Sequence, residues 1–221
     1  MGDQLTLSLA TERTERREPV SSLAPGTVLL AGFALEIEEK LLAELKQVEA
    51  EAPFRHMVTP GGLRMSVAMT NCGALGWVSD QRGYRYDEFD PERSQRWPVM
   101  PDSFRELAIR AADAAGFPGF EPDACLINRY ELGARLTLHQ DKNERALDAP
   151  VVSASLGLPA VFLFGGDARS DRPVRVRLVH GDVIVWGGPA RLRYHGVLPI
   201  KAGRHAALGE HRVNLTFRKA G

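Results

Sequence analysis

The feature that most constrains the fold is a succession of short β-like segments in the second half of the chain. After Pro122, runs rich in hydrophobic and β-branched residues follow one another, and Gly, Pro or Asp separates most of them. In the run 174–179, valines and arginines alternate, so this strand is expected to have one face in water. About eight short strands predict a double-sheet jelly roll. The expected strands are 124–130, 135–139, 151–156, 160–164, 174–179, 183–186, 194–198 and 214–217.

Two helices are expected before this β-rich region. Leucines recur at helical spacing between Glu36 and Ala52, with charged residues between them, and Pro53 then ends the pattern. Asp102-Ser103 is expected to cap a second helix that runs to about residue 115 and ends at Gly116. Helices followed by many strands indicate an α+β protein: a jelly-roll core at 122–221 with the N-terminal helices packed outside.

The remaining parts of the chain are less regular. Residues 1–25 are polar and lack periodicity, so we predict a flexible N-terminal arm there. A single domain is expected at 26–221, and a short strand at 29–33 lies near its start. The stretch 54–101 combines turn residues with tryptophans, tyrosines and arginines. Such aromatic side chains are suited to stacking on flat bases, or they hold a loop-rich cap onto the core. Both interpretations remain open at this point.

Composition restricts where the protein works and what it binds. No apolar run is long enough to cross a membrane, and the polar N-terminus lacks the hydrophobic region of a signal peptide. Cys72 and Cys125 are expected to be reduced, buried thiols, which favours a cytoplasmic protein, and we expect a monomer. The formal net charge is zero. However, basic side chains outnumber acidic ones from Arg172 onward, which indicates either a phosphate-binding surface or an ordinary solvated face.

A His-x-Asp pair, His139 and Asp141, lies at the end of an expected strand. Side chains two positions apart on a strand point to the same face, so both can reach one metal ion. His195 lies in a late strand, and in a jelly roll late strands pair with early ones across the barrel mouth. Two histidines and one carboxylate form the facial triad that binds non-haem iron(II). The pair alone is a short motif, and a polar strand end is the alternative explanation.

The C-terminal segment predicts an anion site. On a strand, Arg212, Asn214, Thr216 and Arg218 face one way, and the apolar residues between them face the other. Inward-facing arginines require an anion, because unpaired buried charge is costly, and a guanidinium pairs best with a carboxylate. The other possibility is an outward polar face on an edge strand. Asn128 and Tyr130 share a strand face and offer further donors; together these groups are suited to a dicarboxylate such as 2-oxoglutarate.

This combination resembles the AlkB family of iron- and 2-oxoglutarate-dependent nucleic-acid demethylases. The resemblance covers nearly the whole chain after the N-terminal arm. It is carried by the segments 53–62, 65–73, 122–130, 138–142, 155–159 and 214–218.

The resemblance implies a role for each matching residue. Iron(II) would be held by His139, Asp141 and His195, with 2-oxoglutarate and O2 as co-substrates. The 2-oxoglutarate site would comprise Asn128, Arg129, Tyr130, Arg212, Asn214, Thr216 and Arg218, with Arg212 on the distal carboxylate. The stretch 54–101 would be a nucleotide-recognition lid. Substrate contacts are implied for Thr59, Met69, Trp77, Tyr84, Arg85, Tyr86, Asn143 and Arg169, although core packing explains Met69 equally well.

The implied reaction is oxidative demethylation of N1-methyladenine- and N3-methylcytosine-type bases in single- or double-stranded DNA, or RNA, with release of formaldehyde, succinate and CO2. One departure stands out, because Asn143 replaces an acidic residue of the family. The amide keeps an acceptor but lacks the negative charge that favours a cationic base. Two rival functions remain: an oxygenase of a protein or small molecule, and a non-enzymatic module with an inert triad.

Overall fold

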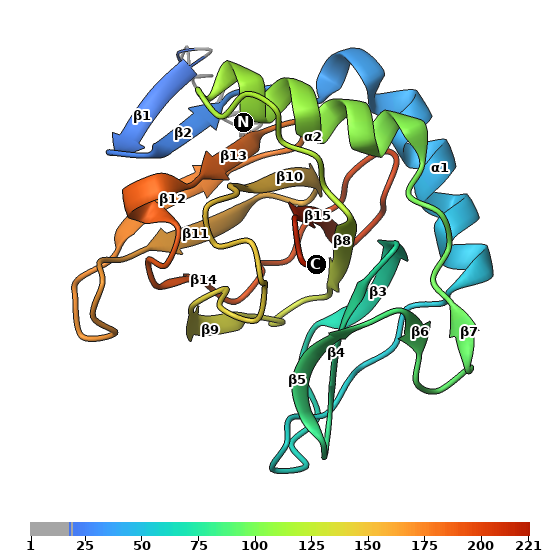
Figure 1. The fold of residues 1–221 in the computed structure, drawn as a ribbon. Coiled ribbons are helices and arrows are strands. Elements are labelled where there is room, and N and C mark those ends of the chain that lie inside the picture. The colour runs from blue at the N-terminus through green and yellow to red at the C-terminus, as the bar shows by residue number, and fades with distance from the viewer. Residues whose placement is uncertain (1–17, 19) are drawn as a thin grey trace, which may run out of the picture.

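The structure is a computed structural model that describes Glu18 and residues 20–221. Its largest element is a seven-stranded sheet in which all neighbouring strands run antiparallel (Figure 1). In spatial order the strands are β1 (Val20–Ala24), β2 (Thr27–Leu30), β13 (Val183–Trp186), β10 (Val151–Gly157), β15 (Arg212–Arg218), β8 (Ala124–Tyr130) and β3 (Ala68–Gly73).

A four-stranded antiparallel sheet packs against one face of the large sheet. Its order is β12 (Val174–Leu178), β11 (Ala160–Phe164), β14 (His195–Val197) and β9 (Leu136–His139). Phe162 and Leu178 of the small sheet share a buried cluster with Ile184 and Trp186 of the large one. Two facing antiparallel sheets form the jelly-roll core that the sequence predicts. All eight predicted strands are present, and their ends differ from the predicted ones by at most two residues.

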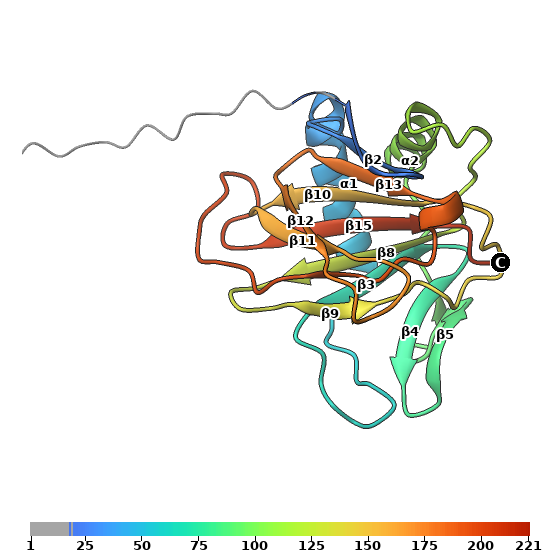
Figure 2. The same ribbon diagram turned by 90° about the vertical axis from the view of Figure 1, so that its left-hand side faces the viewer.

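Two helices cover the other face of the large sheet (Figure 2). A short 3-10 turn, Leu35–Ile37, leads into α1 (Glu38–Glu51), and α2 spans Asp102–Ala114. Apolar side chains at helical spacing on both helices are buried, among them Leu41 of α1 and Leu107 of α2. They belong to one cluster with Val213, Leu215 and Phe217, the outward set of β15. The alternation in β15 therefore divides its side chains between the helices and the space between the sheets.

The start of α2 differs from the prediction. Pro101 occupies the N-cap position, and Asp102 and Ser103 lie inside the first turn. The Ser103 hydroxyl bonds to Glu44 of α1 instead of a backbone N–H group. The predicted cap is therefore wrong, while Gly116, at φ +86°, follows the helix end as expected.

The stretch 54–101 is more ordered than a loop-rich segment. β3 completes the edge of the large sheet, so the prediction of irregular structure is wrong there. The rest contains the hairpin of β4 (Gly76–Asp80) and β5 (Gly83–Asp87) and the short pair β6 (Phe89–Asp90) and β7 (Gln95–Arg96). The β4–β5 hairpin projects from the body of the molecule (Figures 1 and 2).

The N-terminal arm is only partly open to comparison. Residues 20–24 form β1, which pairs with β2, so the predicted arm is wrong for this part. Residues 1–17 and 19 lie outside the described residues. No helix in the described ranges has the length and apolarity that a membrane span requires.

Candidate active site

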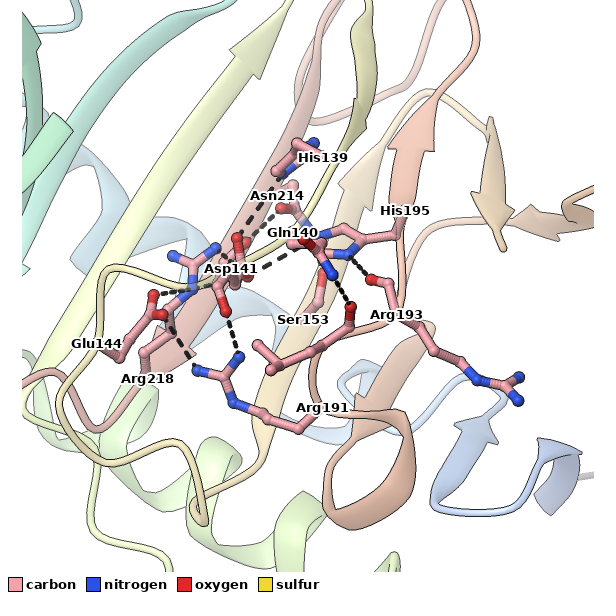
Figure 3. A network of polar contacts seen from close by, with 12 residues as sticks. His139, Gln140, Asp141, Glu144, Ser153, Arg191, Arg193, His195, Asn214 and Arg218 are labelled. Atoms are coloured by element: carbon pink, nitrogen blue, oxygen red, sulfur yellow. Dashed lines mark hydrogen bonds and ion pairs between the residues drawn. The ribbon is translucent and has the colours of Figure 1, made fainter. Parts of the chain in front are cut away.

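The three predicted metal ligands lie together at the end of the small sheet. His139 ends β9, His195 begins β14, and the two are register partners with ring centroids 4.4 Å apart. Gly196 permits this approach, because a Cβ atom there would meet the Leu136 carbonyl oxygen at 2.7 Å. Asp141 lies in the segment just after β9, as it also lies beyond the predicted strand 135–139. Its carboxylate oxygens lie 3.7 Å from the Nε2 atom of each histidine (Figure 3).

The histidine rings are oriented by backbone carbonyls. The Nδ1 atom of His139 lies 2.9 Å from the Thr137 oxygen, and Nδ1 of His195 lies 3.0 Å from the Arg193 oxygen. A carbonyl can only accept, so each Nδ1 carries the proton. Each Nε2 atom then has a free lone pair directed toward Asp141. This is the tautomer that a metal ligand requires.

The electrostatics of the site favour the ligating protonation states. Burial is the largest single influence on Asp141 and opposes its ionisation, but the charge of Arg218, the two histidines and the hydrogen bond from Arg218 together outweigh it. They hold the pKa of the carboxyl below its usual range. Burial, followed by repulsion from His139, lowers the pKa of His195 to about 4. At neutral pH the site therefore presents an anionic carboxylate and a neutral buried imidazole.

The ligand atoms fit one metal ion. They all lie within 4.8 Å of one another, and across Glu18 and residues 20–221 this is the one group of three or more His, Cys, Asp or Glu side chains with such spacing. Two imidazoles and one carboxylate, without a fourth protein ligand, leave coordination positions for small molecules. This donor set matches non-haem iron(II) rather than a closed structural zinc site.

A cavity of about 750 Å³ adjoins the triad, between the two sheets. Arg212 lies in its wall and is 2% exposed. Its Nη2 atom donates to the Ser155 hydroxyl at 2.9 Å, whereas Nε and Nη1 have no hydrogen-bond partner. Burial lowers the pKa of this guanidinium. A buried cation with two unused donors is costly unless an anion completes the site, so this cavity is suited to the free carboxylate of a ligand bound at the metal.

The sequence profile of the 2OG-Fe(II) oxygenase superfamily matches residues 26–218. The chain belongs to this superfamily. Iron(II) is therefore its cofactor, and 2-oxoglutarate and O2 are its co-substrates, in agreement with the donor set of the triad.

Individual relatives agree with this assignment. Alpha-ketoglutarate-dependent dioxygenase AlkB of Escherichia coli (strain K12) is 55% identical over 215 residues, which are 97% of this chain and 98% of the relative. DNA N(6)-methyladenine demethylase ALKBH1C of Arabidopsis thaliana is 29% identical over 241 residues, 97% of this chain and 53% of the relative. The solved structure of OsALKBH1 superposes with a TM-score of 0.81 at 30% identity and covers 91% of this chain and all of that one.

The inner face of β8 and β15 supplies most of the predicted 2-oxoglutarate residues of this oxygenase. Six of the seven line the cavity. They differ in how many of their polar atoms lack a hydrogen-bond partner. The Asn128 Oδ1 atom has no partner, whereas the Asn214 amide donates to the Ser153 hydroxyl and the Thr216 hydroxyl donates to Asn214. The six lining residues are Asn128, Tyr130, Arg212, Asn214, Thr216 and Arg218.

The structure does not place Arg129 in this site. Its neighbours in β8 face the cavity, so Arg129 points to the opposite side of the sheet. There its Nη1 atom donates to Glu49 of α1 at 2.7 Å, and its guanidinium lies 4.4 Å from the Phe54 ring centroid. The prediction that Arg129 binds the co-substrate is wrong, because strand alternation gives it a different partner.

The predicted substrate residues divide in the same way. Six of them line the cavity: Thr59, Met69, Trp77, Tyr84, Asn143 and Arg169. The rings of Trp77 and Tyr84 stack at 5.7 Å with an interplanar angle of 14°. Arg85 lies on the other hairpin face and pairs with Asp80 at 2.9 Å. The Tyr86 hydroxyl donates to Glu144 at 2.6 Å. Neither Arg85 nor Tyr86 lines the cavity, and the substrate contacts expected of them stay predictions.

Two charged residues near the triad were missed by the sequence interpretation. Glu144 and Arg191 are 6% and 3% exposed and face each other across an ion pair of 3.2 Å. Glu144 follows a charged stretch, and Arg191 follows a Gly-Pro turn, and neither position belongs to a periodic pattern. Only the tertiary contact identifies them.

Proposed function

We propose that this 2OG-Fe(II) oxygenase removes N-linked alkyl groups from bases of DNA or RNA, and so reverses alkylation damage directly. The supporting observation is that the stacked Trp77–Tyr84 pair and the His139–Asp141–His195 triad line the same cavity. An aromatic pair at the mouth offers a flat surface to a base, and stacking on such a surface contributes about 1–3 kcal/mol per base. The dioxygenase and demethylase names of the relatives agree with this chemistry.

Each group of side chains has a separate task in this mechanism. His139, Asp141 and His195 hold the iron, and Arg212 pairs with the distal carboxylate of 2-oxoglutarate. When bound, iron with its co-substrates supplies the oxidation of the N-alkyl carbon, which ends in formaldehyde, succinate and CO2. Apolar side chains deep in the cavity, including Phe162 and Trp186, exclude water from the reacting carbon.

The stretch 54–101 acts, in this proposal, as a nucleotide-recognition lid built on the β4–β5 hairpin. A base must leave its stack to reach the triad, which costs a few kcal/mol and costs least in single strands or at damaged pairs. Stacking on Trp77 offsets part of that cost. Single-stranded, alkylated nucleic acid is therefore the favoured substrate. The monomeric state and the cytoplasmic location stay predictions from the sequence.

Asn143 sets the ranking among lesions. It lines the cavity two residues after the ligand Asp141, at the position where the AlkB family has an acidic side chain. An amide accepts a hydrogen bond from a base but adds no negative charge. A cationic N1-methyladenine or N3-methylcytosine therefore gains less from this side chain than it would from a carboxylate.

A single assay tests the function. Formaldehyde release is measured from oligonucleotides that carry N1-methyladenine or N3-methylcytosine, with iron(II), 2-oxoglutarate and O2 present. We expect turnover that His139→Ala abolishes, because that variant removes an iron ligand. Binding of 2-oxoglutarate without turnover on any methylated nucleic acid would instead favour an oxygenase of a protein or small molecule.

A further inference from the structure

A buried cluster of charges lies behind the metal ligand Asp141. Hydrogen bonds and ion pairs join Glu144, Arg191 and Arg218 to the carboxylate (Figure 3). All four side chains are buried. Buried charges are retained in a protein only where their partners compensate the loss of hydration. The contacts within this cluster therefore hold the segments that carry these four residues in fixed positions relative to one another.

All three guanidinium nitrogens of Arg191 bind to the segment 141–149, which follows β9. Its Nη1 atom donates to the Asp141 carbonyl oxygen at 2.7 Å, and Nε donates to the Ala149 carbonyl oxygen at 2.9 Å. Its Nη2 atom forms the 3.2 Å ion pair with Glu144. One side chain thus binds the backbone carbonyl groups at both ends of the segment 141–149 and the Glu144 carboxylate between them.

The place of Arg191 in the chain gives these contacts their significance. It follows the 3-10 turn Gly188–Ala190 and shortly precedes His195, so it belongs to the segment that carries a second ligand. A parallel link joins the same two segments, because the Gln140 amide donates to the Leu192 oxygen at 2.6 Å. Arg191 therefore connects the chain around Asp141 to the chain around His195.

Glu144 connects this link to the carboxylate of Asp141. Its Oε1 atom lies 3.3 Å from Nε of Arg218, and Arg218 donates to the Asp141 carboxylate through Nε at 2.9 Å and Nη2 at 2.7 Å. The backbone of Asp141 is thus held by Arg191 and its side chain by Arg218. The Glu144 carboxylate contacts both arginines.

We propose that Arg191 is a positioning residue of the metal site, which sets the place of Asp141 relative to His195, and that Glu144 holds its guanidinium in place. Without this link the segment 141–149 loses the donors that fix it, and the triad must be ordered by the metal itself. Loss of such an outer partner of a metal ligand typically weakens metal binding about 10–100-fold. The inference rests on the iron site of the proposed function but not on its substrate.

The test measures binding of Mn(II), a redox-inert substitute for iron(II), by the electron paramagnetic resonance signal of the free ion. Arg191→Met keeps an unbranched apolar stem and removes the donors, and Arg191→Lys keeps the charge but cannot reach both carbonyls. Arg129→Met is the matched control, because it also removes an arginine paired with a glutamate, on the opposite face of the sheet. Thermal unfolding of each metal-free variant is recorded in parallel.

We expect both Arg191 variants to bind Mn(II) about 10–100-fold more weakly, with Arg191→Lys the less affected, and Arg129→Met to bind within about twofold of the wild type. A merely structural role would lower the unfolding temperature and leave the Kd of the folded variants unchanged, and that result would overturn the proposal. An equal loss in Arg129→Met would overturn it too.

Two further controls keep the outcome unambiguous. If Arg191→Met does not fold, Glu144→Gln is measured instead. This variant preserves the shape of the side chain and removes the charge that holds Arg191. We expect it to bind Mn(II) more weakly than the wild type, and a wild-type Kd would refute the inference. A wild-type protein that binds Mn(II) but releases no formaldehyde would contradict the proposed function and leave this inference standing.

Discussion

Arg212 and Arg218 come from the same strand and face the same cavity, yet their partners give them different tasks. Arg218 is committed to Asp141 and Glu144. Arg212 has only the Ser155 hydroxyl and two free donors. A charged side chain that already has its anion holds the site together, whereas one without an anion is available to bind a ligand.

This difference predicts the effect of Arg212→Lys. An ammonium cannot reproduce the two-point contact of a guanidinium with a carboxylate, and hydrogen bonds to charged groups contribute about 1.5–3 kcal/mol. We expect the Kd for 2-oxoglutarate, measured by calorimetry with Mn(II) present, to rise about 10–100-fold. Arg129→Lys is the control and should bind 2-oxoglutarate like the wild type. Equal binding by Arg212→Lys would show that the distal carboxylate lies elsewhere.

Asn143→Asp tests the source of lesion preference. A carboxylate at this position adds a negative charge near the bound base, which favours cationic over neutral methylated bases. We expect the ratio of kcat/KM for N1-methyladenine to that for neutral N3-methylthymine to rise about tenfold, or about 1.4 kcal/mol. Asn143→Ala, which adds no charge, should not raise the ratio. If the ratio in Asn143→Asp stayed at the wild-type value, this side chain would not contact the base.

At the level of elements, the β4–β5 hairpin is tied to the segment that carries the metal ligand. Trp77 is the register partner of Tyr86, and the Tyr86 hydroxyl reaches Glu144. Burial raises the pKa of Tyr86 well above its ordinary value, so this hydroxyl remains a donor at neutral pH. The hairpin that presents Trp77 is thus linked to the metal-site network through this hydrogen bond.

Tyr86→Phe removes that bond and little else. Because a hydrogen bond to a carboxylate contributes about 1.5–3 kcal/mol, we expect the KM for a methylated oligonucleotide to rise roughly tenfold or more. The Kd for 2-oxoglutarate should stay nearly unchanged, since the hydroxyl does not line its site. A normal KM together with weakened 2-oxoglutarate binding would contradict this division of roles.

The elements and their faces were largely predictable from the sequence. Alternation in β15 assigned Arg212 to the cavity and Val213 to the helices, and both assignments are observed. The same rule, applied to β8, excludes Arg129 once Asn128 and Tyr130 are placed inside. Periodicity cannot show that Tyr86 reaches Glu144, because that contact joins residues far apart in the sequence. Strand alternation also predicted that His139 and Asp141 reach one metal ion, and this is observed, although Asp141 lies just beyond the end of β9.

For the whole molecule, net charge gives no guide to nucleic-acid binding, since the formal charge is zero. The cavity, however, is lined by the basic residues Arg64, Arg135, Lys142 and Arg169. A local group of cations can bind phosphates on a neutral protein. Attraction to nucleic acid is therefore expected to come from these few contacts rather than from the overall field.

A small number of phosphate contacts predicts a shallow salt dependence. Each neutralised phosphate of a single strand adds about −0.7 to the slope of log K against log salt concentration, so four contacts give at most roughly −3. Fluorescence anisotropy of a labelled oligonucleotide between low and moderate salt measures this slope. Arg169→Gln should reduce its magnitude by about one contact. A much steeper slope would require a larger basic surface than the cavity rim.

The strand order of the large sheet has a consequence for how the protein reaches its folded state. β15 lies between β10 and β8, although it follows every other strand along the chain. Until β15 is synthesised, the pair β3–β8 has no hydrogen-bonded connection to the group formed by β1, β2, β13 and β10. The edges of β8 and β10 that will face β15 are then open. Pairings between distant segments form slowly, and open edges invite aggregation. The chain therefore gains its sheet and its inward-facing arginines in one late step of folding, and a nascent chain that stops before Arg212 acquires neither.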